Sequence, residues 1–251
     1  MEKTNFPNPK LNLPKQWKED VQRQGSFNAI ENYLDLVSEY IYTEISHTNT
    51  NHNTYAWILK LVSESLLRSM YLRNSCVDSI NTRNYPSLFL SIKAWWEVIG
   101  LLSLILNTIK NQNISESDLM IKVERLALGN RGESDSRVGT VDSISVMTML
   151  DSANKYLKDT SGYSEDFFRY FYDIASNPSH PTFDAHALVG GLKNEIWVAK
   201  DSDCIKKAMV DELDSFGGLF MAPLHISMIC DDIFCIEKIK QVTKKSQKYL
   251  T

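Results

Sequence analysis

Apolar residues recur at steps of three and four along most of this chain, which is the spacing of an amphipathic α-helix. The first run extends from Phe27 to Ile45 and follows Ser26, a residue type favoured as an N-cap. Strict alternation of apolar and polar residues, the mark of a half-buried strand, is nearly absent. The pattern therefore predicts an all-α bundle of about eight helices. These helices are expected at approximately residues 26–45, 54–70, 87–110, 115–128, 141–157, 164–175, 203–214 and 218–240.

Polar segments and prolines set the limits of the predicted helices. Pro86 is expected in a first helical turn, where its missing N–H costs nothing, and Pro223 is expected either to begin or to kink the last helix. The helical period is lost near residues 193–199, where a short β element is expected. Residues 1–24 are polar and are expected to form an arm ahead of a single helical domain, residues 25–251.

Composition and charge narrow the class of protein. The chain carries 27 Lys and Arg against 31 Asp and Glu, a net charge of −4, which argues against a protein that coats DNA or other nucleic acid. The most apolar stretch, Ala94 to Leu106, contains Glu97 and is too short to cross a bilayer, so it predicts a buried core helix and no membrane span. No apolar leader begins the chain and the four cysteines form no CxxC pair, so we expect a cytoplasmic protein with free thiols.

The segment Tyr170–His186 carries the main candidate chemistry. It ends an aromatic helix in a turn that contains Pro178 and Pro181, and it includes Asp173, Ser176 and His180. In one interpretation His180 is a general acid or base whose tautomer is set by Asp173 or Asp184. In the other, which we favour, His180 binds helix carbonyls and packs the turn. A metal site made of His180, Asp184 and His186 is a weaker third interpretation, because their spacing fits no regular element, and we predict no metal and no cofactor.

Two further features are candidates for binding. Lys93 and Glu97 lie four residues apart in the otherwise apolar third helix, so they form either an ordinary surface pair or the edge of a polar pocket. Arg131 lies in a glycine-containing loop, Gly129 to Thr140, that either holds a phosphate or simply connects two helices.

Three segments, taken in order, resemble a family of mostly bacterial helical proteins related to the HEPN superfamily. The first is LFLSIKAWWE (88–97), with a basic residue followed by Glu four positions later. The second is LALGNR (126–131), which leads through a polar loop into ISVMTMLD (144–151). The third is YDIASNPSHP (172–181), a tyrosine followed by a small-residue turn and His-Pro. The likeness covers roughly residues 55–190.

This resemblance implies a helical fold, a homodimer and a role connected with RNA, stress or phage defence. Some HEPN proteins are metal-independent ribonucleases that use an Arg and a His separated by a short spacer. Here Arg169 precedes His180 by a longer spacer, which departs from that motif. We therefore expect a non-catalytic, dimeric module that binds RNA, a nucleotide or a protein through Lys93, Glu97, Asp173 and Ser176. The alternative is an endoribonuclease that uses His180 with Arg169 or Arg131.

Overall fold

The computed structural model describes residues 6–13, 21–45, 54–111, 113–128, 144–162, 166–177, 190–194, 196–199, 220–244 and 246–248. Helices dominate these ranges, as predicted, and the β structure is limited to two antiparallel strand pairs, β1–β4 and β2–β3. The strands are β1 (Tyr42–Glu44), β2 (Gly190–Lys193), β3 (Ile196–Ala199) and β4 (Gln247–Lys248). The helices are α2 (Val21–Glu31), α3 (Tyr33–Ser38), α4 (Thr54–Thr82), α5 (Tyr85–Lys110), α6 (Glu116–Leu128), α7 (Val146–Ser161), α8 (Phe167–Ser176), α11 (Ala222–Phe234) and α12 (Glu237–Thr243).

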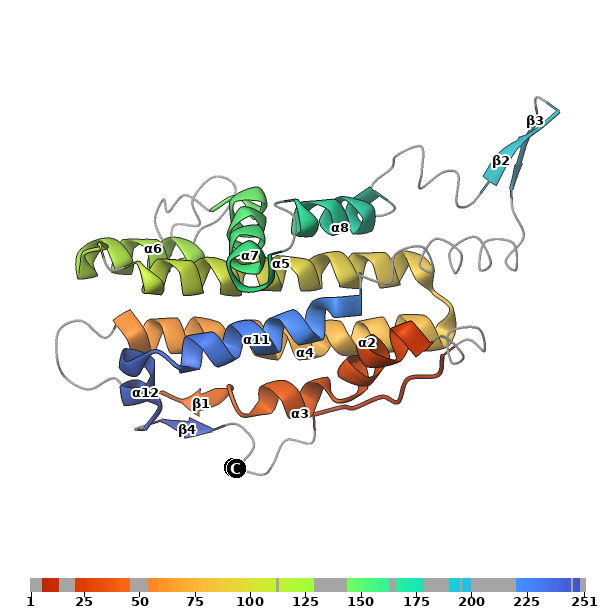
Figure 1. Cartoon of the computed structure of the whole chain (residues 1–251). Coiled ribbons are helices and arrows are strands. Elements are labelled where there is room, and N and C mark those ends of the chain that lie inside the picture. The colour runs from red at the N-terminus through yellow and green to blue at the C-terminus, as the bar shows by residue number, and fades with distance from the viewer. Residues whose placement is uncertain are drawn as a thin grey trace.

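The two longest helices, α4 and α5, form an antiparallel hairpin at the centre of the molecule (Figure 1). Helices α7 and α8 pack on the α5 side of this hairpin, whereas α3 and α12 pack on the α4 side. Helix α11 contacts α5 as well as α2 and α3. Trp95 and Trp96, in the middle of α5, are fully buried, so the most apolar helix of the sequence is the centre of the core.

Helix α5 begins and ends as its sequence predicts. The Asn84 side chain accepts a hydrogen bond from the Ser87 N–H at 3.4 Å, and Pro86 occupies the first turn. The span Pro86–Lys110 is the one helix of the described residues long and apolar enough to cross a membrane, and 67% of its most apolar window is buried inside the molecule. Burial of this kind is typical of a core helix in a globular protein.

The predicted first helix, residues 26–45, is wrong at both ends. Helix α2 already begins at Val21, so Ser26 lies inside it rather than capping it. Residues Tyr42–Glu44 form β1, which pairs with β4 from the other end of the chain. The Tyr42 N–H also donates a hydrogen bond to Ser63 Oγ on α4 at 3.1 Å. These tertiary contacts override a helical period that residues 42–45 carry in the sequence.

The last predicted helix, residues 218–240, is divided in two. Pro223 lies in the first turn of α11, which ends at Phe234, and α12 begins after Ile236. The predicted fifth helix begins later than expected, at Val146, where Ser145 is its N-cap. The short β element expected near residues 193–199 is confirmed as the hairpin β2–β3. The predicted helix at 203–214 and the loop Gly129–Thr140 lie outside the described residues.

The N-terminal region does not divide from the rest at residue 24. Residues 21–24 belong to α2, and Phe6, Leu11 and Leu13 pack against the hydrophobic core. Residues 6–13 therefore contribute to the folded molecule, although they form no regular secondary structure.

Candidate functional site

A cluster of charged and aromatic side chains lies where α4, α5 and α8 meet. Glu97 of α5 accepts a hydrogen bond from the Tyr172 hydroxyl of α8 at 3.3 Å through Oε1. Its other oxygen, Oε2, lies 3.9 Å from Nη2 of Arg68 on α4. Lys93, one turn before Glu97 on α5, places its Nζ 5.5 Å from the centre of the Tyr172 ring, a cation–π distance. We call Arg68, Lys93, Glu97 and Tyr172 the three-helix cluster.

The cluster holds a partly buried carboxylate beneath a more exposed cation. The Glu97 side chain is 26% exposed, whereas that of Arg68 is 58% exposed. With two cations and one carboxylate, the cluster has a formal charge of +1. The positive charges exceed the negative charge, and most of the Arg68 side chain is open to solvent. A carboxylate, a carbonyl or a phosphate of a ligand could accept hydrogen bonds from the Arg68 N–H groups.

Lys93 and Glu97 were predicted from the sequence as a binding pair, and the structure brings them together with Arg68 and Tyr172. Ser176, also predicted, follows Tyr172 by four residues on α8 and so shares its face of the helix. Asp173 is exposed, and no side chain among the described residues binds its carboxylate. The contacts of Tyr172 could not be predicted from the sequence, because its partners, Lys93 and Glu97, are on α5, more than 70 residues earlier.

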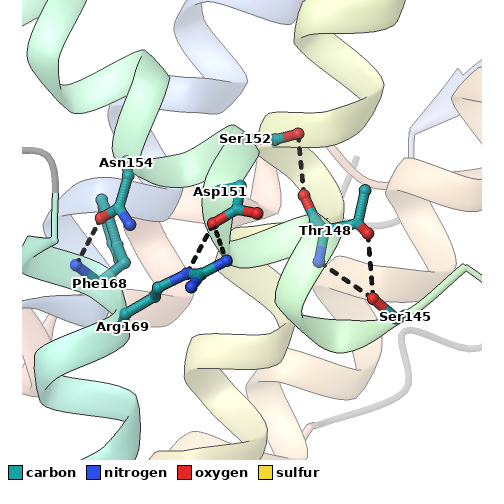
Figure 2. Close-up of polar contacts among 7 residues, drawn as sticks. All are labelled: Ser145, Thr148, Asp151, Ser152, Asn154, Phe168 and Arg169. Carbon is teal, nitrogen blue, oxygen red and sulfur yellow. Dashed lines mark hydrogen bonds and ion pairs between the residues drawn. The ribbon is translucent and has the colours of Figure 1, made fainter.

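Arg169, predicted as a catalytic residue, forms an ion pair that joins α8 to α7. Its Nε and Nη2 atoms each lie 2.6 Å from Oδ1 of Asp151 (Figure 2). Both side chains are substantially exposed, so the pair is expected to contribute less than about 1 kcal/mol to stability. The Asp151 carboxylate already accepts hydrogen bonds from two of the Arg169 donors. The role of Arg169 toward a phosphate remains a prediction.

Beside this ion pair, α7 supplies a cap for α8. The buried side chain of Asn154 accepts a hydrogen bond from the Phe168 N–H at 2.7 Å, in the first turn of α8 (Figure 2). The adjacent surface pocket, of about 350 Å³, is lined by Asp151, Asn154, Lys155, Lys158 and Asp166. Its two lysines face two aspartates, so this pocket favours neither an anion nor a cation.

A buried histidine that the sequence analysis did not select lies in the aromatic core. The imidazole of His225, on α11, is 6% exposed and packs against Trp96, Phe167 and Phe168, with ring centres 6.4, 6.0 and 5.1 Å away. Neither of its nitrogens has a hydrogen-bond partner among the described residues. Burial lowers the pKa of His225 to about 4, so the ring is neutral at pH 7.

Several predicted residues cannot be placed. His180, Arg131, Asp184 and His186 lie outside the described residues. Within the described ranges, no group of three or more His, Cys, Asp or Glu side chains could hold a metal ion. Cys76, Cys230 and Cys235 are free thiols, as expected. Burial raises the pKa of the Cys76 and Cys230 thiols well above the usual range, so neither can supply a thiolate nucleophile at neutral pH.

Comparison with known proteins gives no family for this chain, since no family model, curated protein or solved structure matches it. The HEPN resemblance therefore remains a prediction from the three segments that carry it.

Proposed function

We propose that this protein is a non-catalytic binding module that recognises another protein through the three-helix cluster. The observation that carries the proposal is the exposed guanidinium of Arg68, held over the partly buried carboxylate of Glu97 by a cluster drawn from α4, α5 and α8. At 3.9 Å this ion pair attracts the guanidinium without a hydrogen bond, so the N–H donors of Arg68 can bind a ligand carboxylate or carbonyl. Arg and Tyr are also the residue types that most often dominate the energetics of protein interfaces.

The surroundings of the cluster favour a protein ligand over RNA. Glu64 lies one turn before Arg68, and Asp173 follows Tyr172, so acidic and basic groups are interspersed on this face. Tyr71, 62% exposed, lies one turn after Arg68 and supplies apolar contact area. Binding to a polyphosphate backbone requires a surface with an excess of positive charge, whereas a protein interface tolerates mixed charges.

We further propose that the protein acts as a homodimer in the cytoplasm. Strand β3 exposes Ile196, Trp197 and Val198, and an isolated two-stranded hairpin is at best marginally stable in water. An added strand from a second copy would bind the edge of β3 that pairs with no described strand, and would extend the sheet. The exposed free thiol of Cys235 favours a reducing compartment.

Site-specific photo-crosslinking in the producing cells tests the protein-ligand proposal. A photoreactive phenylalanine analogue replaces the exposed Glu64 of α4, which lies one turn before Arg68 and on the same face of the helix. We expect a covalent adduct with a protein, which ribonuclease does not remove. The charge reversals Arg68→Glu and Lys93→Glu should each lower the yield of this adduct about tenfold. The matched control is Lys122→Glu on the exposed face of α6, which should leave the adduct unchanged. An adduct with RNA, or a protein adduct insensitive to Arg68→Glu, would contradict the proposal.

The alternative, a metal-independent endoribonuclease, is tested with a mixed RNA pool in the presence of EDTA. Wild-type protein and His180→Ala are compared at equal concentration. Under our proposal neither cleaves the RNA. Cleavage by the wild type alone would replace the proposal with the nuclease and would make His180 its acid or base.

A further inference from the structure

The C-terminal half of α4 binds residues 6–13 through their main chain. Asn74 Nδ2 donates to the Pro7 carbonyl at 2.6 Å, and Arg73 Nη1 donates to the Pro9 carbonyl at 3.0 Å. Arg83 Nη1 lies 3.4 Å from the Asn12 carbonyl. We call residues 6–13 the N-terminal strap, which Figure 1 draws in dark red. Because these bonds run from side chains of α4 to backbone atoms of the strap, they recognise an extended chain whatever its side chains are.

Asn81 recognises the strap by a two-point contact. Its Nδ2 donates to the Lys10 carbonyl at 2.8 Å, and its Oδ1 accepts the Asn12 N–H at 2.6 Å. A single side-chain amide thus binds one carbonyl and one N–H that are two residues apart. In an extended chain such groups can face the same way, whereas in a helix they point to different sides.

The spacing of the two asparagines fits a polyproline-type segment. Asn74 and Asn81 are seven residues apart, so they share a face of α4 and are separated by roughly 10 Å along its axis. Their carbonyl partners, on Pro7 and Lys10, are three residues apart, which is about 9 Å in a polyproline II helix and about 10 Å in an extended strand. The match explains how one helix face can follow this strap, and Pro7 and Pro9 favour that conformation before binding.

Three strap side chains add apolar contacts. Phe6 packs edge-on against Tyr71 of α4, with ring centres 4.8 Å apart, and Leu11 and Leu13 pack against the core. Of the other five strap residues, Pro7, Asn8, Lys10 and Asn12 are exposed and Pro9 is half-buried. The contact thus holds an extended, proline-containing segment by its backbone and adds apolar contacts at spaced positions.

We propose that the face formed by residues 71–82 of α4 and the adjoining Arg83 is a recognition site for an extended, proline-containing segment of a partner protein, and that the strap occupies it in cis. This inference does not depend on the three-helix cluster. A tethered segment competes at an effective concentration on the order of millimolar. The intact chain therefore holds the site closed against a partner segment of similar affinity until the strap is released.

The test keeps the full chain and cuts it only after folding. A protease site is placed between residues 13 and 21, the protein is purified folded, and half of it is cleaved. A fluorescent peptide with the sequence of residues 1–13 is then titrated, with anisotropy as the measurement. We expect saturable binding to the cleaved protein, and at least about tenfold weaker binding to the uncut protein because of the tethered strap.

Two variants locate the peptide on α4. Asn81→Ala should weaken peptide binding about tenfold, because it removes both hydrogen bonds of one amide. Asn28→Ala, an exposed asparagine of α2, is the matched control and should have no effect. If Asn81→Ala impairs folding, a peptide N-methylated at Asn12 removes the same N–H from the ligand side, with N-methylation at Leu13 as its control.

Three outcomes would overturn the proposal. The cleaved, folded protein could fail to exchange the labelled peptide. It could unfold when the strap leaves, as judged by circular dichroism, which would make the strap an integral part of the fold. The uncut protein could form a dimer that exchanges straps, which would make a second copy, rather than a partner protein, the occupant. None of these results depends on whether Arg68 or Lys93 binds a ligand, so they are separate from the test of the proposed function.

Discussion

Arg73 is a charged side chain that the fold uses to bind main-chain carbonyls. It is 1% exposed, and its Nε donates to the Ile30 carbonyl at 2.9 Å, near the end of α2. Its Nη1 holds the Pro9 carbonyl of the strap. A single guanidinium thus joins α4, α2 and the strap, which a lysine with one compact ammonium could not do.

Removing this guanidinium should be costly because its carbonyl partners would remain buried. We expect Arg73→Met to lower the free energy of unfolding by about 2–3 kcal/mol, measured by urea denaturation. The control is Arg68→Met on the same helix. Its guanidinium is 58% exposed, so its loss should change stability by less than about 0.5 kcal/mol. Equal effects of the two substitutions would show that Arg73 is not the junction described.

His225 should make stability depend on pH in the acid range. Its pKa is lowered by burial from 6.5 to about 4, so between these values the unfolded chain binds a proton that the folded chain does not. This contribution to stability is fully present above pH 6.5 and is lost as the pH falls toward 4. The difference in pKa corresponds to about 3 kcal/mol at most. Carboxylates also titrate below pH 5, so only a comparison with a variant isolates the histidine.

We expect His225→Leu to remove this part of the pH dependence. The two unpartnered nitrogens disappear, so the variant should be at least as stable as the wild type at pH 5, despite some repacking. Urea denaturation at pH 7 and pH 5 measures both proteins, with Met228→Leu on the exposed side of α11 as the control. Parallel changes in the wild type and His225→Leu would mean that His225 does not titrate as described.

The role of a residue could be predicted from the sequence only when its partners lie close to it along the chain. Lys93 and Glu97 stand out because they interrupt an apolar helix, and they do belong to a polar cluster. Asn154 interrupts the apolar stripe of α7 in the same way, but its partner, the Phe168 N–H, is on the next helix. The roles of Arg73 and His225 could not be predicted, since each depends on several elements distant in sequence.

At the scale of elements, α8 depends on a cap from its neighbour α7. Its own N-cap residue, Asp166, makes no side-chain capping bond, and the Asn154 side chain of α7 binds the Phe168 N–H instead. We expect Asn154→Ala to lower the free energy of unfolding by about 1–2 kcal/mol in thermal or urea unfolding, because it leaves a buried N–H without a partner. Arg169→Ala, which breaks the exposed ion pair between the same two helices, should cost less than about 1 kcal/mol. A larger loss of stability in Arg169→Ala than in Asn154→Ala would make the ion pair the main contact between α7 and α8.

The hairpin β2–β3 depends on a glycine beneath a tryptophan. A Cβ added at Gly190 would overlap the indole ring of Trp197, whereas one added at Gly191 would meet nothing. We expect Gly190→Ala to speed amide exchange of residues 190–199, measured by hydrogen–deuterium exchange mass spectrometry, and Gly191→Ala to leave it unchanged. The exchange rates of helical amides should not change in either variant. Among the described elements, β2 and β3 make extensive contacts only with each other. Equal changes in amide exchange for Gly190→Ala and Gly191→Ala would contradict the packing of Trp197 over Gly190.

Helix bounds could be predicted where the local sequence decides them. Asn84 with Pro86 begins α5, and Gly162, with its φ of 69°, ends α7. The start of α7 was predicted too early, at residue 141, because the apolar period extends ahead of its N-cap, Ser145. Residues 42–44 could not be predicted, because their strand partner, β4, is at residues 247–248. The same holds for the break between α11 and α12, which no proline or glycine marks.

At the scale of the whole molecule, the sequence predicts the class of fold but not its assembly. The strongly apolar sequence of α5 makes this helix the centre of the core, and α4, α7, α8 and α11 all pack against it. Which faces meet is set by contacts between distant segments, so the three-helix cluster and the strap site could not be assembled from local pattern. The strap in particular carries little helical or strand signal, and its fit to α4 depends on the spacing of Asn74 and Asn81.

The proposed homodimer can be tested on the hairpin without disturbing the helices. Ile196 is 66% exposed on β3, a strand that has no charged residue along its edge, and Figure 1 shows the hairpin projecting from the helical body. We expect the wild-type protein to sediment as a dimer at high concentration and Ile196→Lys to sediment as a monomer, because a lysine on an edge strand opposes pairing with another strand. The control Met228→Lys places the same charge at another exposed apolar position, on α11, and should leave the dimer intact. Circular dichroism should show the same helical content in all three proteins. A monomer at every concentration, or a dimer that tolerates Ile196→Lys, would remove the hairpin as the interface between copies.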